Sequence, residues 1–278
     1  MTVSARLLTY ADAGQARRVV AAHPVRNVFV ASRLDAGVLN PLVPGTVWGW
    51  PDDHVEALLH VGANMAPVAA GPEALAAFAQ ACGPRRTCQS IVGPSQMVLT
   101  LWRLLTQLWG AAYAQTREVR PQQPVMTIRH GPEVAGDPRV RAITMAEFEP
   151  YLAASVAMYT EEVGDDPRGH GAPDDYRNHC RWLVEHGRAF GIVEDGRVVF
   201  KSDIGAASGG VAQLQGVWLD PSLRGRGASK AAVASVVARM LRQYQTVSLY
   251  VNDFNVRAVR CYERIGFHVV DEFATVLY

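Results

Sequence analysis

The chain has 278 residues, with 27 lysine or arginine and 26 aspartate or glutamate residues, so its formal net charge is +1. Such a balanced charge gives no general attraction for nucleic acid or for an anionic membrane. No apolar run approaches the roughly 18 residues of a membrane span, and Met1–Tyr10 lacks the charge pattern of a signal peptide. We therefore expect a cytoplasmic protein with enough chain for two domains.

The thiols and imidazoles show no metal-binding spacing. No CxxC pair occurs among the cysteines, which are Cys82, Cys88, Cys180 and Cys261. We therefore expect no metal, and reduced thiols that act as small hydrophobic side chains. Three histidines lack acidic partners at ligand spacing and are expected at the surface: His170, His179 and His186.

In chain order, the first half is expected to form two helices, three strands, a helix, a strand and a helix. These cover residues 15–22, 27–35, 46–50, 56–61, 66–70, 73–81, 86–92 and 96–109. Ser95 is the expected N-cap of the last helix. Residues 125–129 are expected to be extended. The prolines and glycines of 131–138 then mark the boundary between domains at 1–135 and 139–278.

The second half has a more regular pattern. Thr144 and Glu147 form a capping box for a helix over 145–160, and Asp195-Gly196 favours a hairpin turn. A loop rich in Gly, Asp and Pro is expected over 164–173. The remaining strands are expected over 140–143, 189–193, 198–204, 211–219, 247–251 and 267–277, and the remaining helices over 174–186, 228–244 and 255–265.

Residues 217–229 read Val-Trp-Leu-Asp-Pro-Ser-Leu-Arg-Gly-Arg-Gly-Ala-Ser and lead from a strand into a helix. The start of a helix offers unpaired N–H groups and the positive end of the helix dipole, so it attracts anions. Gly225 and Gly227 let a phosphate approach the backbone. Arg224 and Arg226 add guanidinium groups suited to phosphate oxygens. The segment therefore predicts a diphosphate-binding loop.

The glycine spacing differs from two other phosphate loops. It lacks the GxxxxGK[ST] pattern, and Lys230 stands where a GxGxxG pattern needs its last glycine. A solvated arginine-containing turn before an amphipathic helix is the alternative, and the loop alone leaves both interpretations open.

A second motif follows after one predicted helix and one predicted strand. It has the form N-x-x-A-x-x-x-Y-x-x-x-G-F, at Asn255, Ala258, Tyr262, Gly266 and Phe267. Together with the loop, in which Arg224, Gly227 and Ser229 match R/Q-x-x-G-x-G/A, it resembles the GNAT acetyltransferases. Serine at the last loop position is a conservative departure, since it is small. The resemblance covers Arg139 to Tyr278.

The resemblance implies an α/β (α+β) GNAT fold, in which helices flank a mixed central sheet, with acetyl-CoA as the cofactor. Val217, Trp218 and Leu219 would pair with the pantetheine arm after a bulge at Gly216. The diphosphate would be held by the loop residues, which are Arg224, Gly225, Arg226, Gly227, Ala228 and Ser229.

Two residues of the second motif have implied roles. Tyr262 would protonate the leaving thiolate, with packing in the core as the alternative. Asn255 would cap its helix and contact the cofactor arm.

The general base is left unassigned by the sequence. Many relatives carry a glutamate on the strand before the loop, whereas this chain has Gln213 and Gln215, and neither amide is a base. The acidic candidates are Glu161, Glu162, Asp165, Asp166 and Asp203. Glu161 and Glu162 are our candidate catalytic residues because the loop after the first helix borders the acceptor site in this family. A solvated acidic helix end is the alternative.

The first half shows a similar order of elements without an RGxG loop, so we expect a degenerate GNAT-like domain. This layout resembles actinobacterial GNAT proteins with an N-terminal domain of unknown function. The expected function is acetyl transfer from acetyl-CoA to a primary amine of a small molecule, peptide or protein. A non-catalytic CoA-binding regulatory module and a structural tandem domain are the alternatives, and a homodimer is left open.

Overall fold

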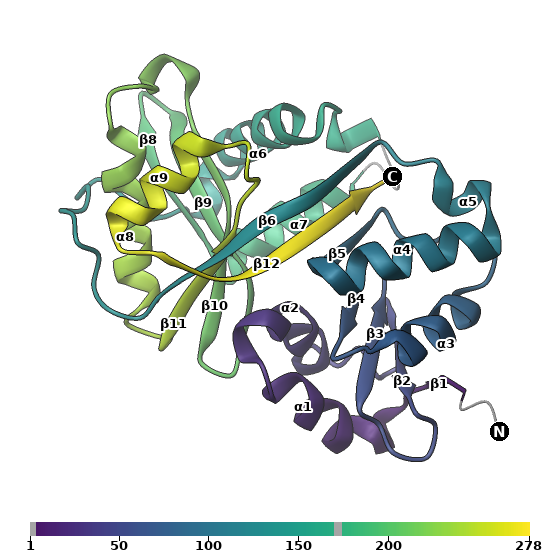
Figure 1. Cartoon of the computed structure of the whole chain (residues 1–278). Helices are drawn as coiled ribbons and strands as arrows, with labels where there is room; N and C mark the ends of the chain where they lie inside the picture. Colours follow the sequence, from purple (N-terminus) through teal and green to yellow (C-terminus); the bar gives the residue numbers. More distant parts are fainter. Residues whose placement is uncertain (1–3, 170–173) are drawn as a thin grey trace.

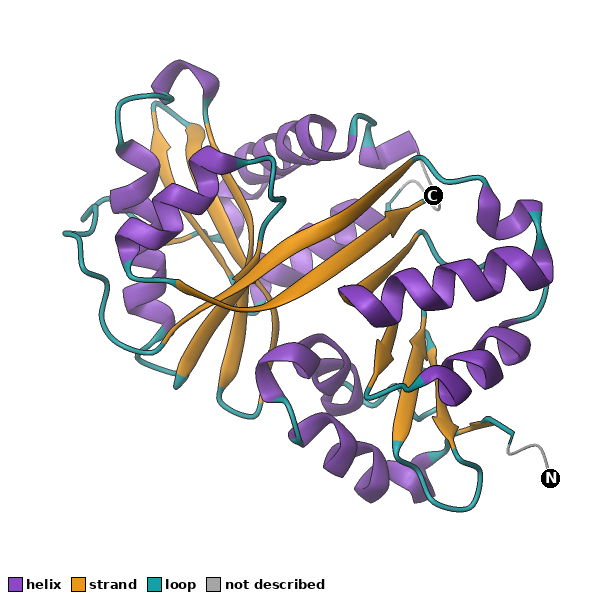
Figure 2. Cartoon of the chain, viewed as in Figure 1, coloured by secondary structure: helices purple, strands orange, loops and turns teal. Residues whose placement is uncertain are grey.

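A computed structural model of the protein describes residues 4–169 and 174–278. His170 and the last part of the predicted 164–173 loop lie outside the described residues. The described strands form one twelve-stranded sheet in the order β1-β2-β3-β4-β5-β12-β6-β11-β10-β9-β8-β7. Helices cover both of its faces (Figure 2).

The first half contains strands β1 (Arg6–Leu7), β2 (Thr46–Trp50), β3 (Ala57–Val61), β4 (Asn64–Val68), β5 (Ser90–Pro94) and β6 (Glu118–Ile128). Its helices are α1 (Ala13–Ala21), α2 (Pro24–Asp35), α3 (Pro72–Cys82), α4 (Ser95–Trp109) and α5 (Ala111–Ala114).

The second half contains strands β7 (Arg141–Ala142), β8 (Ala189–Glu194), β9 (Arg197–Ser208), β10 (Val211–Leu219), β11 (Thr246–Tyr250) and β12 (His268–Leu277). Its helices are α6 (Phe148–Val163), α7 (Asp175–Glu185), α8 (Ala228–Met240) and α9 (Val256–Ile265), with 3-10 turns at η2 (Met145–Glu147), η3 (Pro167–Gly169) and η4 (Pro221–Leu223).

The two halves share a topology and exchange a strand. β1 to β5 are continued in the sheet by β12 of the second half, while β7 to β11 are continued by β6 of the first half. β6 pairs antiparallel with both β11 and β12, and β12 pairs antiparallel with β5. Figure 1 shows β6 and β12 running side by side between the halves. The mixed sheet and the repeated layout confirm the predicted fold, whereas the exact domain boundary stays a prediction.

Alternation along the strands places the core on both faces of the sheet. On β9, Val199 packs with α8 and α9, while its neighbour Val198 packs with α6 and α7. In the first half, Leu59 of β3 packs with α3 and α4, while Leu58 packs with α1 and α2. Each half is therefore a three-layer unit around the common sheet.

Local capping chemistry was partly predictable. The Thr144–Glu147 capping box is present, and Asp195 and Gly196 adopt the positive φ values of 48° and 72° that the hairpin needs. The prediction for Ser95 is wrong, because β5 runs directly into α4 and Pro94 is the cap residue. The Ser95 hydroxyl instead donates to the Pro121 carbonyl at 2.9 Å.

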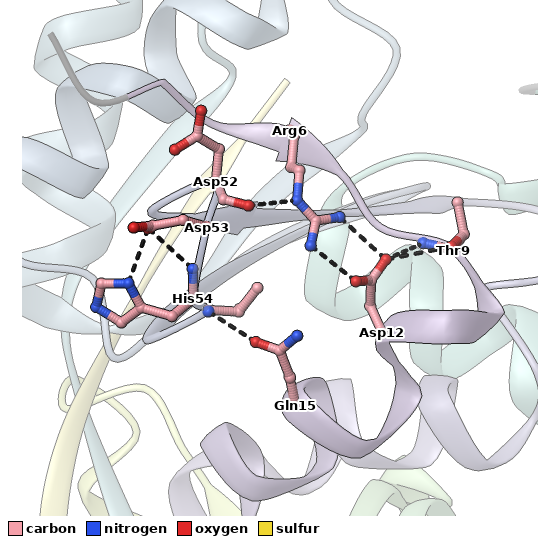
Figure 3. Close-up of polar contacts among 8 residues, drawn as sticks. Arg6, Thr9, Asp12, Gln15, Asp52, Asp53 and His54 are labelled. Atoms are coloured by element: carbon pink, nitrogen blue, oxygen red, sulfur yellow. Dashed lines mark hydrogen bonds and ion pairs between the residues drawn. The ribbon is translucent and has the colours of Figure 1, made fainter. Parts of the chain in front are cut away.

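The buried carboxylate of Asp12 holds the first described residues of the chain against the start of α1 (Figure 3). The Arg6 guanidinium donates to both oxygens of Asp12, at 3.0 and 2.7 Å. The Thr9 N–H donates to Asp12 at 2.9 Å. The hydrogen bond from Arg6, together with the one from Thr9, holds the pKa of Asp12 well below its usual range. The short edge strand β1 is thereby anchored to α1.

Candidate active site

The open edge of β10 begins where this strand leaves β11. The two strands pair in parallel only from Val211 to Gln213, opposite 246–248. Gly216 has a φ of 60°, and the register of β10 against β9 shifts between Gln215 and Trp218. This confirms the predicted bulge. Because residues 217–219 pair only with β9 or with no described strand, their other edge can accept a strand-like ligand arm.

The loop between β10 and α8 has the form of an anion cradle. Gly225 and Gly227 have φ values of 81° and 77°, which favour glycine, and a Cβ atom at either would meet nothing within 4 Å. Within the described part of the chain, the N–H groups of residues 225–229 donate no hydrogen bond. Unpaired N–H groups at a helix start suit the two linked phosphates of coenzyme A.

Arg224 holds the loop in place through hydrogen bonds to Leu219 and Glu161. Its Nε donates to the Leu219 carbonyl at 2.9 Å, and its Nη2 donates to Glu161 Oε2 at 2.7 Å. The other Glu161 oxygen accepts from the Trp218 indole at 3.2 Å. Both carboxylate oxygens of Glu161 are thus engaged with cofactor-loop residues. Arg226, in contrast, is exposed and has no ion-pair partner among residues 4–169 and 174–278.

The second motif places a phenol beside the open edge. Asn255 caps α9, and its side chain accepts from the Ala258 N–H at 3.2 Å. Tyr262 is only 8% exposed and packs edge-on against Phe267. Burial, with smaller contributions from Cys261 and Glu162, raises the pKa of Tyr262. The phenol therefore keeps its proton at neutral pH and can act as a hydrogen-bond donor.

Ser229, the departure from the family pattern, lies in the first turn of α8. Burial raises the pKa of the Cys261 thiol on α9, and Ser229 opposes this rise. The backbone N–H of Ser229 donates no hydrogen bond within the described part of the chain, so the serine leaves the backbone of the loop open.

Most of the acidic candidates already have partners. Asp203 is buried. It accepts a hydrogen bond from the Lys201 ammonium at 2.5 Å and another from the Tyr151 hydroxyl at 2.8 Å. Asp166 pairs with Arg168 at 2.6 Å. Asp165 also interacts with a neighbour. Gln213 is buried and Gln215 is exposed, both on β10.

Glu162 differs from its neighbour Glu161. Its side chain is 53% exposed, and one carboxylate oxygen lies 3.6 Å from Arg120 Nη1. It also contributes to the raised pKa of Tyr262 and of Tyr250, at the end of β11. Glu162 thus pairs with Arg120 of β6, whereas Glu161 pairs with Arg224 of the cofactor loop.

Two members of this region were missed by sequence reasoning. Arg120 enters it on β6, from the first half of the chain, and Tyr250 enters it at the end of β11. Neither belongs to a local motif. The neighbourhood of Arg120 follows from the strand exchange, which only the three-dimensional pairing reveals.

The corresponding loop of the first half, between β4 and α3, lacks the features of a phosphate-binding loop. Its helix α3 begins with Pro72, which has no N–H group, and Glu73 places a carboxylate in the first turn. Both features disfavour a phosphate. The first-half loop therefore lacks the features on which the predicted diphosphate cradle of the second half depends.

The bulged strand, the open β10 edge and the unpaired N–H groups lie together at the start of α8. Residues 155–267 match the sequence model of the acetyltransferase (GNAT) family, and residues 45–151 match a domain of unknown function (DUF4081). The second half is therefore a GNAT acetyltransferase domain preceded by a DUF4081 domain, and its family implies acyl transfer from acyl-CoA. No curated protein matches the sequence.

Solved structures share the whole layout. A GCN5-related N-acetyltransferase from Sphaerobacter thermophilus is 17% identical, with 98% of this chain and 94% of that chain covered and a TM-score of 0.59. A Drosophila protein is 12% identical over 99% and 98% of the two chains, with a TM-score of 0.69. A tandem GNAT protein of clavulanic acid biosynthesis is 16% identical over 98% of each, with a TM-score of 0.57. These similarities establish a shared fold.

Neither a membrane-spanning helix nor a metal-binding cluster is found among the described residues. In the described ranges, no helix is both long and apolar enough to span a bilayer. No cluster of three or more His, Cys, Asp or Glu side chains placed to hold a metal occurs among the same residues.

Proposed function

We propose that the protein is an N-acetyltransferase that moves the acetyl group of acetyl-CoA to a primary amine of a small molecule or peptide. The observation that carries this proposal is the conjunction of the open β10 edge with the unpaired N–H groups of residues 225–229. When bound, acetyl-CoA supplies an acyl group activated as a thioester. A cytoplasmic location and a homodimer stay predictions.

The cofactor-binding residues divide by contact. Backbone groups of Val217, Trp218 and Leu219 hold the extended arm, as in β-strand addition. The diphosphate is held by N–H groups of the loop and by the exposed Arg226 guanidinium, over Gly225, Arg226, Gly227, Ala228 and Ser229. Asn255 fixes the start of α9 beside the arm. Arg224 positions the loop through Leu219 and Glu161.

Two side chains handle protons. Tyr262 donates its hydroxyl hydrogen to the departing thiolate, as a hydrogen bond or as a proton, and its raised pKa keeps the phenol protonated until then. Glu162, whose half-exposed carboxylate lies 3.6 Å from Arg120, receives the amine and accepts its proton directly or through water. Glu161 acts by position, since both of its oxygens are already bonded.

A CoA-binding regulatory module is the alternative, motivated by glutamine at positions 213 and 215, on the strand where many relatives carry a glutamate. The two functions differ in turnover. Titration calorimetry with CoA, followed by thiol-release assays with acetyl-CoA and glycine, ethanolamine, putrescine or a lysine peptide, separates them. Thiol release that depends on an amine supports the enzyme. Tight CoA binding without turnover supports the module, and absence of CoA binding excludes both.

A further inference from the structure

Arg120 links the first half of the chain to the site on the second half. It lies on β6, is 7% exposed, and its Nη2 donates to the Glu118 carboxylate at 2.9 Å and to the Glu162 carbonyl at 2.8 Å. Its Nη1 lies 3.6 Å from Glu162 Oε1. One guanidinium therefore contacts both the backbone and the carboxylate of the last turn of α6.

Burying the Arg120 guanidinium costs free energy of hydration. Within the described part of the chain, its Nε is buried and has no hydrogen-bond partner. A buried guanidinium loses its hydration, and apolar side chains of similar volume often replace buried ion pairs without loss of stability. Stability alone therefore gives little reason for an arginine here.

The surroundings of Arg120 suggest what the arginine does. Glu162 is 53% exposed and Glu118 is 40% exposed, so both carboxylates reach solvent while the guanidinium does not. Tyr250 is 37% exposed. Burial, followed by Glu162, raises the pKa of Tyr250 to about 12, and Arg120 opposes this rise. Glu162 and Arg120 thus form one ion pair at the end of α6, and its charges act on the pKa of Tyr250 at the end of β11.

We propose that Arg120 is a positioning residue for the amine acceptor. It fixes the Glu162 carboxylate at the end of α6, so that the first half of the chain completes the acceptor site on the acetyltransferase domain. This inference rests on the proposed function. It gives the N-terminal half an indirect part in catalysis, through Glu162 and the exchanged strand, although that half has no cofactor cradle of its own.

The first test replaces Arg120 by Met, which keeps an unbranched side chain and removes the guanidinium. With the most reactive amine of the panel above, KM for that amine should rise and kcat should fall, together lowering kcat/KM on the order of 100-fold. Affinity for CoA and the melting temperature should stay close to wild type. The conservative Arg120→Lys variant should recover part of kcat/KM, because it keeps the charge.

A double-mutant cycle identifies the residue through which Arg120 acts. Glu162→Gln should lower kcat/KM as Arg120→Met does, and the double variant should be no worse than Glu162→Gln alone. Glu118→Gln is the matched control, since it removes the other carboxylate partner of Arg120, and it should change kcat/KM less than threefold. Glu162→Gln keeps the inference testable if Arg120→Met does not fold.

The outcomes separate the two proposals. A wild type that is inactive with every amine of the panel removes the proposed function, and the acceptor role with it. An active wild type with unchanged kinetics in Arg120→Met removes the acceptor role alone. Additive losses in the double variant, or an effect of Glu118→Gln as large as that of Glu162→Gln, would also overturn it.

Discussion

The ammonium of Lys201 lies 2.5 Å from a carboxylate oxygen of Asp203, and the two residues are 1% and 2% exposed. The Tyr151 hydroxyl donates to the second oxygen at 2.8 Å. A Cβ atom on Gly216 would lie only 2.7 Å from Asp203 and 3.0 Å from Lys201. The buried pair therefore lies against the bulge that turns β10 away from β11, and it leaves room there for glycine alone.

Breaking this pair should destabilise the fold. Lys201→Met leaves a buried carboxylate without its cation, so we expect a loss of about 3–5 kcal/mol in the free energy of unfolding. Lys201→Met/Asp203→Asn should recover most of that loss, because no uncompensated charge stays buried. Urea unfolding of the three proteins checks this. A double variant as unstable as the single one would show that packing, rather than charge, dominates.

Blocking the phosphate cradle should weaken cofactor binding. Gly227→Trp places a large side chain over the N–H groups of the loop, and we expect CoA affinity to fall at least roughly tenfold. Gly209→Trp is the matched control, because Gly209 also has a positive φ and open space around it but lies in the β9–β10 turn. Calorimetry with CoA compares the two. Equal affinities would overturn the assignment of the loop.

Removing the phenol of Tyr262 should slow turnover. Tyr262→Phe keeps the ring that packs on Phe267 and deletes the proton donor, so we expect kcat to fall on the order of 100-fold. CoA affinity should be unchanged. Thiol release under saturating acetyl-CoA and amine measures kcat. Wild-type turnover in this variant would leave Tyr262 with packing only.

The Asp12 carboxylate should contribute to stability at neutral pH. Its pKa is lowered by Arg6 and Thr9 in the folded protein, so its stabilisation is present above the usual carboxyl pKa of about 4 and is lost as the pH falls below that value. We expect Asp12→Asn to cost about 1 kcal/mol at pH 7, and the difference from wild type to shrink as acid is added.

Asp166→Asn controls for this effect. The Arg168 side chain also lowers the pKa of Asp166, to about 2, but both side chains are largely exposed. Solvent screens such a pair, so melting temperatures should match wild type at every pH. A pH-independent loss in Asp12→Asn would instead point to lost hydrogen bonds.

The sequence predicted features that depend on neighbouring residues. Strands 46–50 and 211–219 have the predicted bounds, and the Thr144 capping box and the bulge at Gly216 are present. These features follow from local chemistry such as side-chain alternation, cap hydrogen bonds and positive φ at glycine. The positive φ values expected of Gly225 and Gly227 are also present, whereas phosphate binding by their loop stays a prediction.

Features that depend on distant pairing escaped prediction. Ser95 looks like an N-cap, yet its partner is the Pro121 carbonyl of another segment. Glu161 and Glu162 are adjacent and alike in sequence, but one binds Arg224 of the loop and the other lies near Arg120 of β6. The strand exchange that carries Arg120 into place leaves no periodic signal, because either strand order satisfies the same alternation.

The exchanged strands make the halves mechanically inseparable. A hinge between the two lobes would have to break the backbone hydrogen bonds of β6 with β12, and separating the two halves of the chain would also break those of β6 with β11 and of β12 with β5. A gene truncated to 139–278 would leave β11 with a bare edge and β12 without both neighbours, a template for aggregation. The exchanged strands β6 and β12 therefore require both halves of the chain to fold together.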